Sequence, residues 1–149
     1  MKIAIFGSIA FYNEMQQTKK RLENMGHEVV LPPFEIENEE GKMISVRQYY
    51  EIRKMSSADT SWVWKRKKEV MRKYLDKIAW ADAILVLNYD KNNIEGYVGS
   101  NTLIEMGVAF YLDKLIYLLN SIPEMNCKEE IFGMGPTTLD GNINKIQKI

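Results

Sequence analysis

Three short runs of apolar residues, separated by stretches of helical length, constrain the fold of this chain more than any other feature. They are KIAIFG from residue 2, AILVL from residue 83 and KLIYLL from residue 114. Unbroken apolar runs of this length are typical of strands that are buried on both faces of a parallel sheet. The intervening segments have helical patterns, over residues 12–25, over 46–81 with a break near SSADTS, and after GSNT. Strands that alternate with helices predict an α/β domain with a mainly parallel sheet.

Weaker signals complete the predicted element list. A glycine stop in NMGHEVV precedes a second strand, a short helix is expected near KEEIFG, and a last strand at PTTL. The acidic stretch EIENEEGK has no periodicity and is interpreted as a loop over one edge of the domain. We therefore expect one domain over residues 1–149, a Rossmann-like three-layer sandwich around a five-stranded sheet.

Charge and composition exclude several classes of protein. The formal net charge is zero, which gives no electrostatic reason to bind nucleic acid or an anionic membrane. Cys127 and His27 are the only cysteine and histidine, so neither an intrachain disulfide nor a Cys/His metal cluster is expected. The first apolar run is too short for the core of a signal peptide, and no run is long enough to span a bilayer. These observations predict a cytoplasmic protein with a small-molecule partner.

Small and polar residues follow the predicted strands, in FGSIAFYN, NYDKNNIEGYVGSNT and NSIPEM. In open α/β sheets, ligands bind beyond the carboxyl ends of the strands. The candidate binding residues at this edge are therefore Gly7, Ser8, Ile9, Asn88, Asp90, Gly99, Ser100, Asn101 and Thr102. The GSNT segment is suited to cap the next helix and to bind an anion there, and ordinary capping is the alternative. Neither a GxGxxG fingerprint nor a P-loop is present.

Glu105 is the one charged residue between Tyr97 and Leu112, inside a predicted helix that is apolar nearly all round. Asn101 and Thr102 precede it by four and three residues and share its helical face. A buried carboxylate is costly unless it is hydrogen-bonded, which favours a functional role. The positive end of the helix dipole is expected to keep it ionised, as a nucleophile or a general base. The alternative is that it pairs with a surface lysine or caps a neighbouring element.

Two aspartates are candidates for a second carboxylate, which glycosyl chemistry typically needs. Asp76 lies before the central strand and Asp90 ends it; a solvated helix position and a turn former are the respective alternatives. The basic run KRKKEVMRK favours a solvated helix face, with a phosphate contact from one of its cations as the alternative.

Three segments together resemble the nucleoside 2-deoxyribosyltransferase superfamily, which includes the deoxynucleoside-monophosphate N-glycosidases. They are FGSIAF, LDKIAWADAILVL and GSNTLIEMGVAFYLDKLIYLL. The most specific part is the E-x-G-x-A pattern at Glu105, Gly107 and Ala109, followed by DKLIYLL. The resemblance implies a flavodoxin-like α/β fold, a homodimer or higher homo-oligomer, and cleavage of an N-glycosidic bond without a metal or cofactor.

The resemblance also implies roles for individual residues. Glu105 matches the nucleophile that attacks the anomeric carbon, and Asp76 matches an aspartate that assists the base. Gly7 and Ser8 match the loop that lines the sugar pocket. The segment matched to the sugar hydroxyl or 5′-phosphate contains Ser100, Asn101 and Thr102.

The expected function is cleavage or transfer at the N-glycosidic bond of a (deoxy)nucleoside or nucleoside 5′-monophosphate, in nucleotide salvage. Water as the acceptor gives a hydrolase, and a second base gives a transferase. The alternative is a non-catalytic nucleotide-binding or regulatory module on the same fold. A phosphoribohydrolase of the lysine-decarboxylase-like group is disfavoured, because its usual PGGxGTxxE motif is absent.

Overall fold

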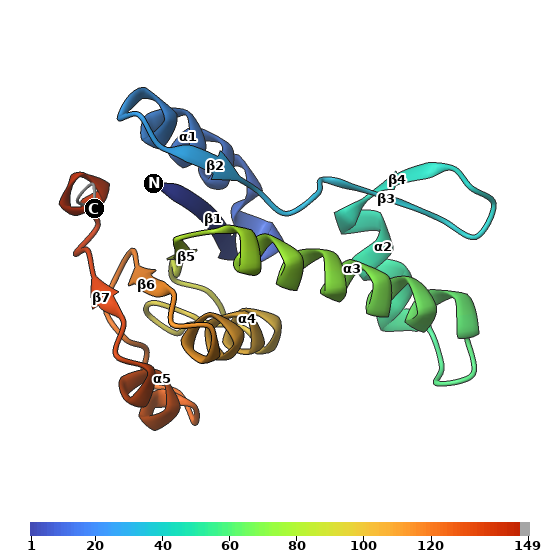
Figure 1. The fold of residues 1–149 in the computed structure, drawn as a ribbon. Coiled ribbons are helices and arrows are strands. Elements are labelled where there is room, and N and C mark those ends of the chain that lie inside the picture. The colour runs from blue at the N-terminus through green and yellow to red at the C-terminus, as the bar shows by residue number, and fades with distance from the viewer. Residues whose placement is uncertain (147–149) are drawn as a thin grey trace.

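Five parallel strands form the central sheet of the structure, a computed structural model that describes residues 1–146 (Figure 1). The strand order is β2–β1–β5–β6–β7, and each neighbouring pair is parallel. This confirms the predicted five-stranded α/β sheet. The bounds are β1 Lys2–Gly7, β2 Glu28–Val30, β5 Ala83–Leu87, β6 Leu115–Leu118 and β7 Thr137–Thr138.

Helices cover both faces of the sheet. Successive strand residues point to opposite faces, so each strand contributes side chains to both layers of the core. Ile3 and Ile5 of β1 pack on the side of α1 (Tyr12–Asn24) and the 3-10 turn η2 (Ile143–Lys145). Ala4 and Phe6 pack on the opposite side, against α3 (Ser61–Trp80), α4 (Ser100–Tyr111) and α5 (Lys128–Met134). The result is the predicted three-layer sandwich, and the helices begin and end close to the expected residues (Figure 1).

An insertion between β2 and α3 projects away from the sheet (Figure 1). It contains the antiparallel hairpin of β3 (Glu35–Glu37) and β4 (Met43–Ser45), followed by α2 (Val46–Met55). The prediction of an acidic loop over EIENEEGK was wrong for this hairpin. Ile36 is buried between two exposed glutamates, and that apolar position, together with the glycine turn at Gly41 (φ +81°), is enough to form a short strand pair.

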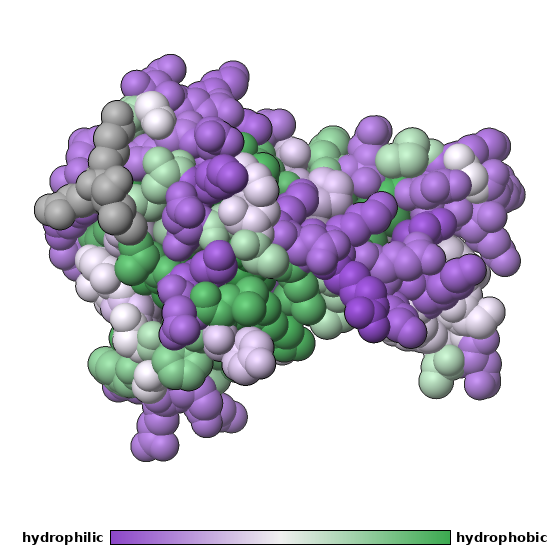
Figure 2. All heavy atoms as spheres, viewed as in Figure 1, coloured by the Kyte–Doolittle hydropathy of each residue, from purple (hydrophilic) through white to green (hydrophobic). Residues whose placement is uncertain are grey.

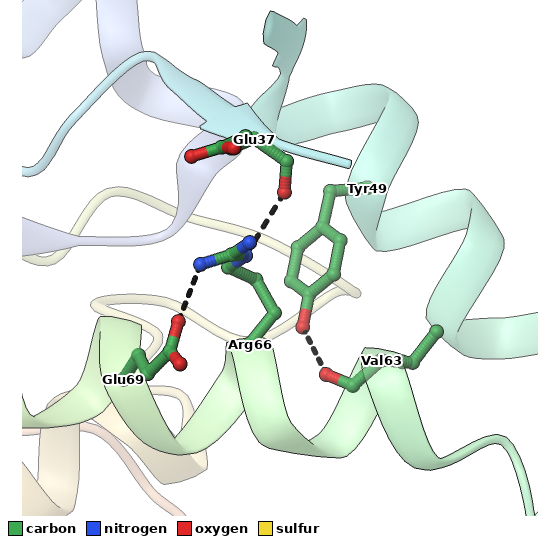
Figure 3. A network of polar contacts seen from close by, with 5 residues as sticks. All are labelled: Glu37, Tyr49, Val63, Arg66 and Glu69. Atoms are coloured by element: carbon green, nitrogen blue, oxygen red, sulfur yellow. Dashed lines mark hydrogen bonds and ion pairs between the residues drawn. The ribbon is translucent and has the colours of Figure 1, made fainter. Parts of the chain in front are cut away.

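The insertion is fastened to α3 by a small polar network (Figure 3). The Tyr49 hydroxyl donates to the Val63 carbonyl at 2.6 Å, and Tyr49 is buried with Ile36 and Val63 in a separate apolar cluster. Arg66 of α3 donates to the Glu37 carbonyl at 2.9 Å and pairs with Glu69. The Tyr49 bond holds α2 against α3, and the Arg66–Glu37 bond holds β3 against α3.

The connection from β5 to α4 is fixed by a buried asparagine. The Asn88 side chain donates to the carbonyls of Gly96 at 3.2 Å and Ser121 at 2.9 Å, and it accepts from the Asn120 amide at 2.8 Å. Asp90 accepts a hydrogen bond from the Gly96 amide at 3.0 Å. The loop that leads into α4 is therefore tied to the ends of both β5 and β6. Within residues 1–146, none of the helices is both long and apolar enough to cross a membrane.

Gly96 is the position in this loop where a side chain fits least. Its φ is +66°, and an added Cβ would lie 2.6 Å from the Ser121 carbonyl oxygen. We predict that Gly96→Ala lowers the free energy of unfolding by roughly 2 kcal/mol or more, because both the backbone angle and the contact are unfavourable. Urea unfolding followed by circular dichroism measures this change.

Gly133→Ala is the matched control, because Gly133 is helical and an added Cβ meets nothing within 4 Å. It should leave stability unchanged or slightly raised. Equal stability of Gly96→Ala and the wild type would show that the loop into α4 is not held as described.

Candidate active site

A cavity of about 340 Å³ lies beyond the carboxyl end of β1. This volume is in the range of small-molecule sites. Five parts of the chain line it: the end of β1 and the start of α1, the Pro32–Phe34 segment, the insertion, α3 and α4. Residues 1–146 include no group of three His, Cys, Asp or Glu side chains that could hold a metal ion.

Glu105 of α4 lies on the wall of this cavity and is only 6% exposed. No hydrogen bond or ion pair within residues 1–146 engages its carboxyl group. The pKa of Glu105 is raised to about 8, because the effect of burial exceeds the opposing effect of the nearby Lys67 ammonium. The expectation that the helix dipole keeps Glu105 ionised was wrong, because desolvation raises the pKa of Glu105 well above its ordinary value.

Two of the four GSNT residues at the start of α4 line the cavity, and two do not. Asn101 and Thr102 line the cavity together with Glu105, as expected from their helical spacing. Gly99 and Ser100 are not part of the cavity wall. The helix has no side-chain cap, since its N-cap residue is Gly99, so the predicted capping by the polar residues of GSNT was wrong.

Residues of the first loop, after β1, have two roles: some line the cavity and one makes structural hydrogen bonds. Gly7 and Ile9 line the cavity. An added Cβ at Gly7 (φ +149°) would lie 3.0 Å from the Leu87 carbonyl oxygen, so the close approach of β1 and β5 requires glycine. Ser8 caps the 3-10 turn η1 (Ile9–Phe11), and its hydroxyl accepts from Lys91 Nζ at 2.7 Å. Ser8 thus ties the first loop to the β5–α4 connection.

Three further candidates lie away from the cavity wall. Asn88 and Asp90 stabilise the loop before α4, as described above, and neither lines the cavity. Asp76 is exposed on α3 and is likewise absent from the wall. In the described part of a single chain, Glu105 is therefore the one carboxyl group on the cavity wall.

Several cavity residues were not predicted from the sequence. The insertion and α3 contribute Arg47, Tyr49, Arg53, Lys67 and Tyr74. Lys67 belongs to the basic run KRKKEVMRK, and only the alternative interpretation of that run, a phosphate contact, pointed toward a site. The two arginines and two tyrosines had no motif around them, since their placement depends on how α2 packs on α3.

The charged and ionisable groups on the wall influence one another. The pKa of Lys67 is lowered to about 8, first by burial and next by the Arg53 guanidinium, while Glu105 acts in the opposite direction. Burial raises the pKa of Tyr74, and the Glu105 carboxyl adds to that rise. These couplings indicate that Arg53, Lys67, Tyr74 and Glu105 share one poorly solvated environment.

Comparison with known proteins gives matches among solved structures alone. No protein-family model and no curated protein matches the chain. A 2-deoxyribosyltransferase from the psychrotolerant bacterium Bacillus psychrosaccharolyticus is similar at 20% identity, with 79% of this chain and 71% of that chain covered and a TM-score of 0.46. A CMP N-glycosidase of Clostridium botulinum is similar at 14% identity, with 93% and 85% covered and a TM-score of 0.45. Similarities this low assign no activity to this chain.

The pKa of Glu105 predicts a specific pH dependence of stability. It is about 8 in the folded protein, against an ordinary value of 4.5. Between these values the unfolded chain binds fewer protons than the folded one, so the free energy of unfolding falls as the pH rises. We predict that Glu105→Gln removes this fall, and at pH 8 raises the free energy of unfolding above that of the wild type by roughly 2 kcal/mol or more.

Urea unfolding at pH 5, 6.5 and 8 measures the difference between the two proteins. The difference in the free energy of unfolding between Glu105→Gln and the wild type should be smallest at pH 5, where the Glu105 carboxyl is protonated in the folded state. Asp76→Asn, the same chemical change at an exposed position, should follow the wild type at all three values. A constant difference between Glu105→Gln and the wild type across this range would contradict the raised pKa.

Proposed function

We propose that the protein cleaves or transfers at the N-glycosidic bond of a (deoxy)nucleoside or nucleoside 5′-monophosphate, with Glu105 as the nucleophile. The observation that supports this most is the Glu105 carboxyl itself: buried, without a hydrogen-bond partner in the described residues, and on the wall of a ligand-sized cavity. Buried polar groups in folded proteins are normally hydrogen-bonded. A buried carboxyl group with a strongly raised pKa on the wall of a cavity is the pattern found at catalytic sites.

The chemistry follows from a lone carboxylate beside a sugar. The ionised Glu105 oxygen attacks the anomeric carbon, the bond from that carbon to the base nitrogen breaks, and its electron pair leaves with the base, which takes up a proton. Water or a second base then attacks the same carbon and releases Glu105. Because burial raises the pKa of Glu105 to about 8, its proton must leave before the attack.

The other cavity residues suit the remaining parts of such a substrate. Aromatic rings of Phe6, Tyr12, Phe34, Tyr49 and Tyr74 supply flat apolar surface for a base. The Tyr12 and Phe34 rings already lie 4.7 Å apart, centroid to centroid. Asn101 and Thr102 place polar groups on the helical face of Glu105, where a sugar hydroxyl would lie.

A nucleotide-binding module without chemistry is the second candidate, and the raised pKa of Glu105 favours it. A carboxyl group with a pKa of about 8 is largely neutral at pH 7, so it can donate a hydrogen bond to a bound ligand instead of attacking it. Saturable binding of a nucleotide with no release of free base would support this candidate.

The homo-oligomer and the cytoplasmic location implied above stay predictions. Apolar side chains gather over α4 on the face shown in Figure 2. The large apolar side chains that are exposed on α4, and between it and the start of β6, are Ile104, Phe110, Tyr111, Leu112 and Leu115. We propose that a second copy of the chain packs on this surface, since contiguous exposed apolar patches mark interaction sites.

Glu105→Gln tests the catalytic role. We predict that it lowers the rate of base release by at least about 10³-fold, because the amide cannot attack the anomeric carbon. Chromatographic detection of free base, after incubation with a panel of nucleosides, deoxynucleosides and their 5′-monophosphates, measures the rate.

Asp76→Asn is the matched control, since it makes the same carboxyl-to-amide change off the cavity wall. We expect it to retain base release. Loss of activity in this variant would give Asp76 the role that the sequence resemblance implies. Base release by Glu105→Gln at the wild-type rate would refute the nucleophile.

A further inference from the structure

Three cationic side chains from α2 and α3 line the cavity. Arg47 and Arg53 belong to α2, and Lys67 belongs to α3. No ion pair among residues 1–146 engages any of the three. Two cations of the same helices outside the cavity are paired: Lys54 with Glu51 at 3.6 Å, and Arg66 with Glu69. Other cations of α3, such as Arg72, also lack an ion pair within the described residues, but they do not line the cavity.

The cavity has no acidic side chain to balance these charges except Glu105. Lys67 and Arg53 are close enough that the guanidinium lowers the pKa of the lysine, so like charges are held together in a poorly solvated space. Like charges held this close repel one another, and a bound anion offsets that repulsion.

Arg53 is held in place rather than free to move into solvent. Its guanidinium carbon lies 5.2 Å from the centre of the Tyr49 ring and 5.3 Å from that of Tyr50. Tyr49 is itself fixed by its hydrogen bond to Val63 (Figure 3). Stacking uses the face of the guanidinium and leaves its N–H edge available for an oxygen ligand.

We propose that Arg47, Arg53 and Lys67 form a phosphomonoester subsite on the α2–α3 wall, through which the cavity prefers a nucleoside 5′-monophosphate to the free nucleoside. This rests on the proposed function and specifies its substrate class. It places the phosphate on the insertion, away from the N-terminus of α4, where Ser100 does not reach the cavity wall. The phosphate oxygens accept hydrogen bonds from the two guanidinium groups and the ammonium group, and the sugar extends toward Glu105.

Isothermal titration at low salt tests the subsite by binding, independently of turnover. The ligands are a nucleoside 5′-monophosphate, the matching nucleoside, and ribose 5-phosphate, which separates phosphate recognition from base recognition. We expect the wild type to bind the monophosphate at least about 10-fold more tightly than the nucleoside, as charge-assisted hydrogen bonds predict. Arg47→Gln and Arg53→Gln should each remove most of this preference, because they weaken binding of the monophosphate much more than binding of the nucleoside.

Arg72→Gln is the matched control, because it removes one positive charge from an exposed position of α3 outside the cavity. It should retain the preference, as should Ser100→Ala. The subsite is refuted if the wild type binds nucleoside and monophosphate equally, if no ligand of the panel binds, or if Ser100→Ala rather than Arg53→Gln removes the preference. Arginine-dependent phosphate preference without any base release would instead refute the proposed function and keep the subsite.

Discussion

Parallel pairing of β1 with β5 is the constraint on which the site depends. The pairing ends at Gly7 opposite Leu87, and the chain leaves the two strands at the same edge of the sheet. From β1 the sheet grows outward through β2, and from β5 it grows through β6 and β7 in the other direction. Connections leaving two such strands diverge and open a crevice between them, which is where open α/β sheets bind ligands. Here that crevice is walled by the first loop and α4, and the insertion closes it from the side.

Burial shifts the pKa values of two ionisable groups in the crevice, Glu105 and Lys67. Glu105 and Lys67 both have a pKa of about 8, the first raised and the second lowered by burial. Glu105 is buried and Lys67 is half-buried, and neither makes a hydrogen bond to a protein group among the described residues. The fold is less stable for keeping them so, as is usual where activity requires groups that only a ligand satisfies. Burial of Glu105 therefore lowers the stability of the fold at the same position where the proposed reaction needs a carboxylate.

The sequence was sufficient for the parts of the fold that local patterns determine. The AILVL run became a strand buried at all five positions, and Glu105 lies in a cavity as its isolation on an apolar helix suggested. The hairpin of the insertion was missed because its single buried residue, Ile36, gives too short a pattern to recognise. Arg53 was missed because its role depends on the packing of α2 against α3, a contact between segments that no local periodicity encodes. The superfamily resemblance implied that Asp76 assists the base, but Asp76 lies on the exposed face of α3 and does not line the cavity.

The most direct test of the account is whether the sugar becomes covalently attached to Glu105. Wild-type protein is mixed with a substrate from which it releases base, quenched in acid during turnover and digested, and the peptide that contains residues 99–112 is examined by mass spectrometry. The account predicts an added mass equal to the glycosyl group, with or without phosphate, located on Glu105 and absent from Glu105→Gln. Base release at the full rate with no adduct on this residue, or with an adduct on another side chain, would contradict it.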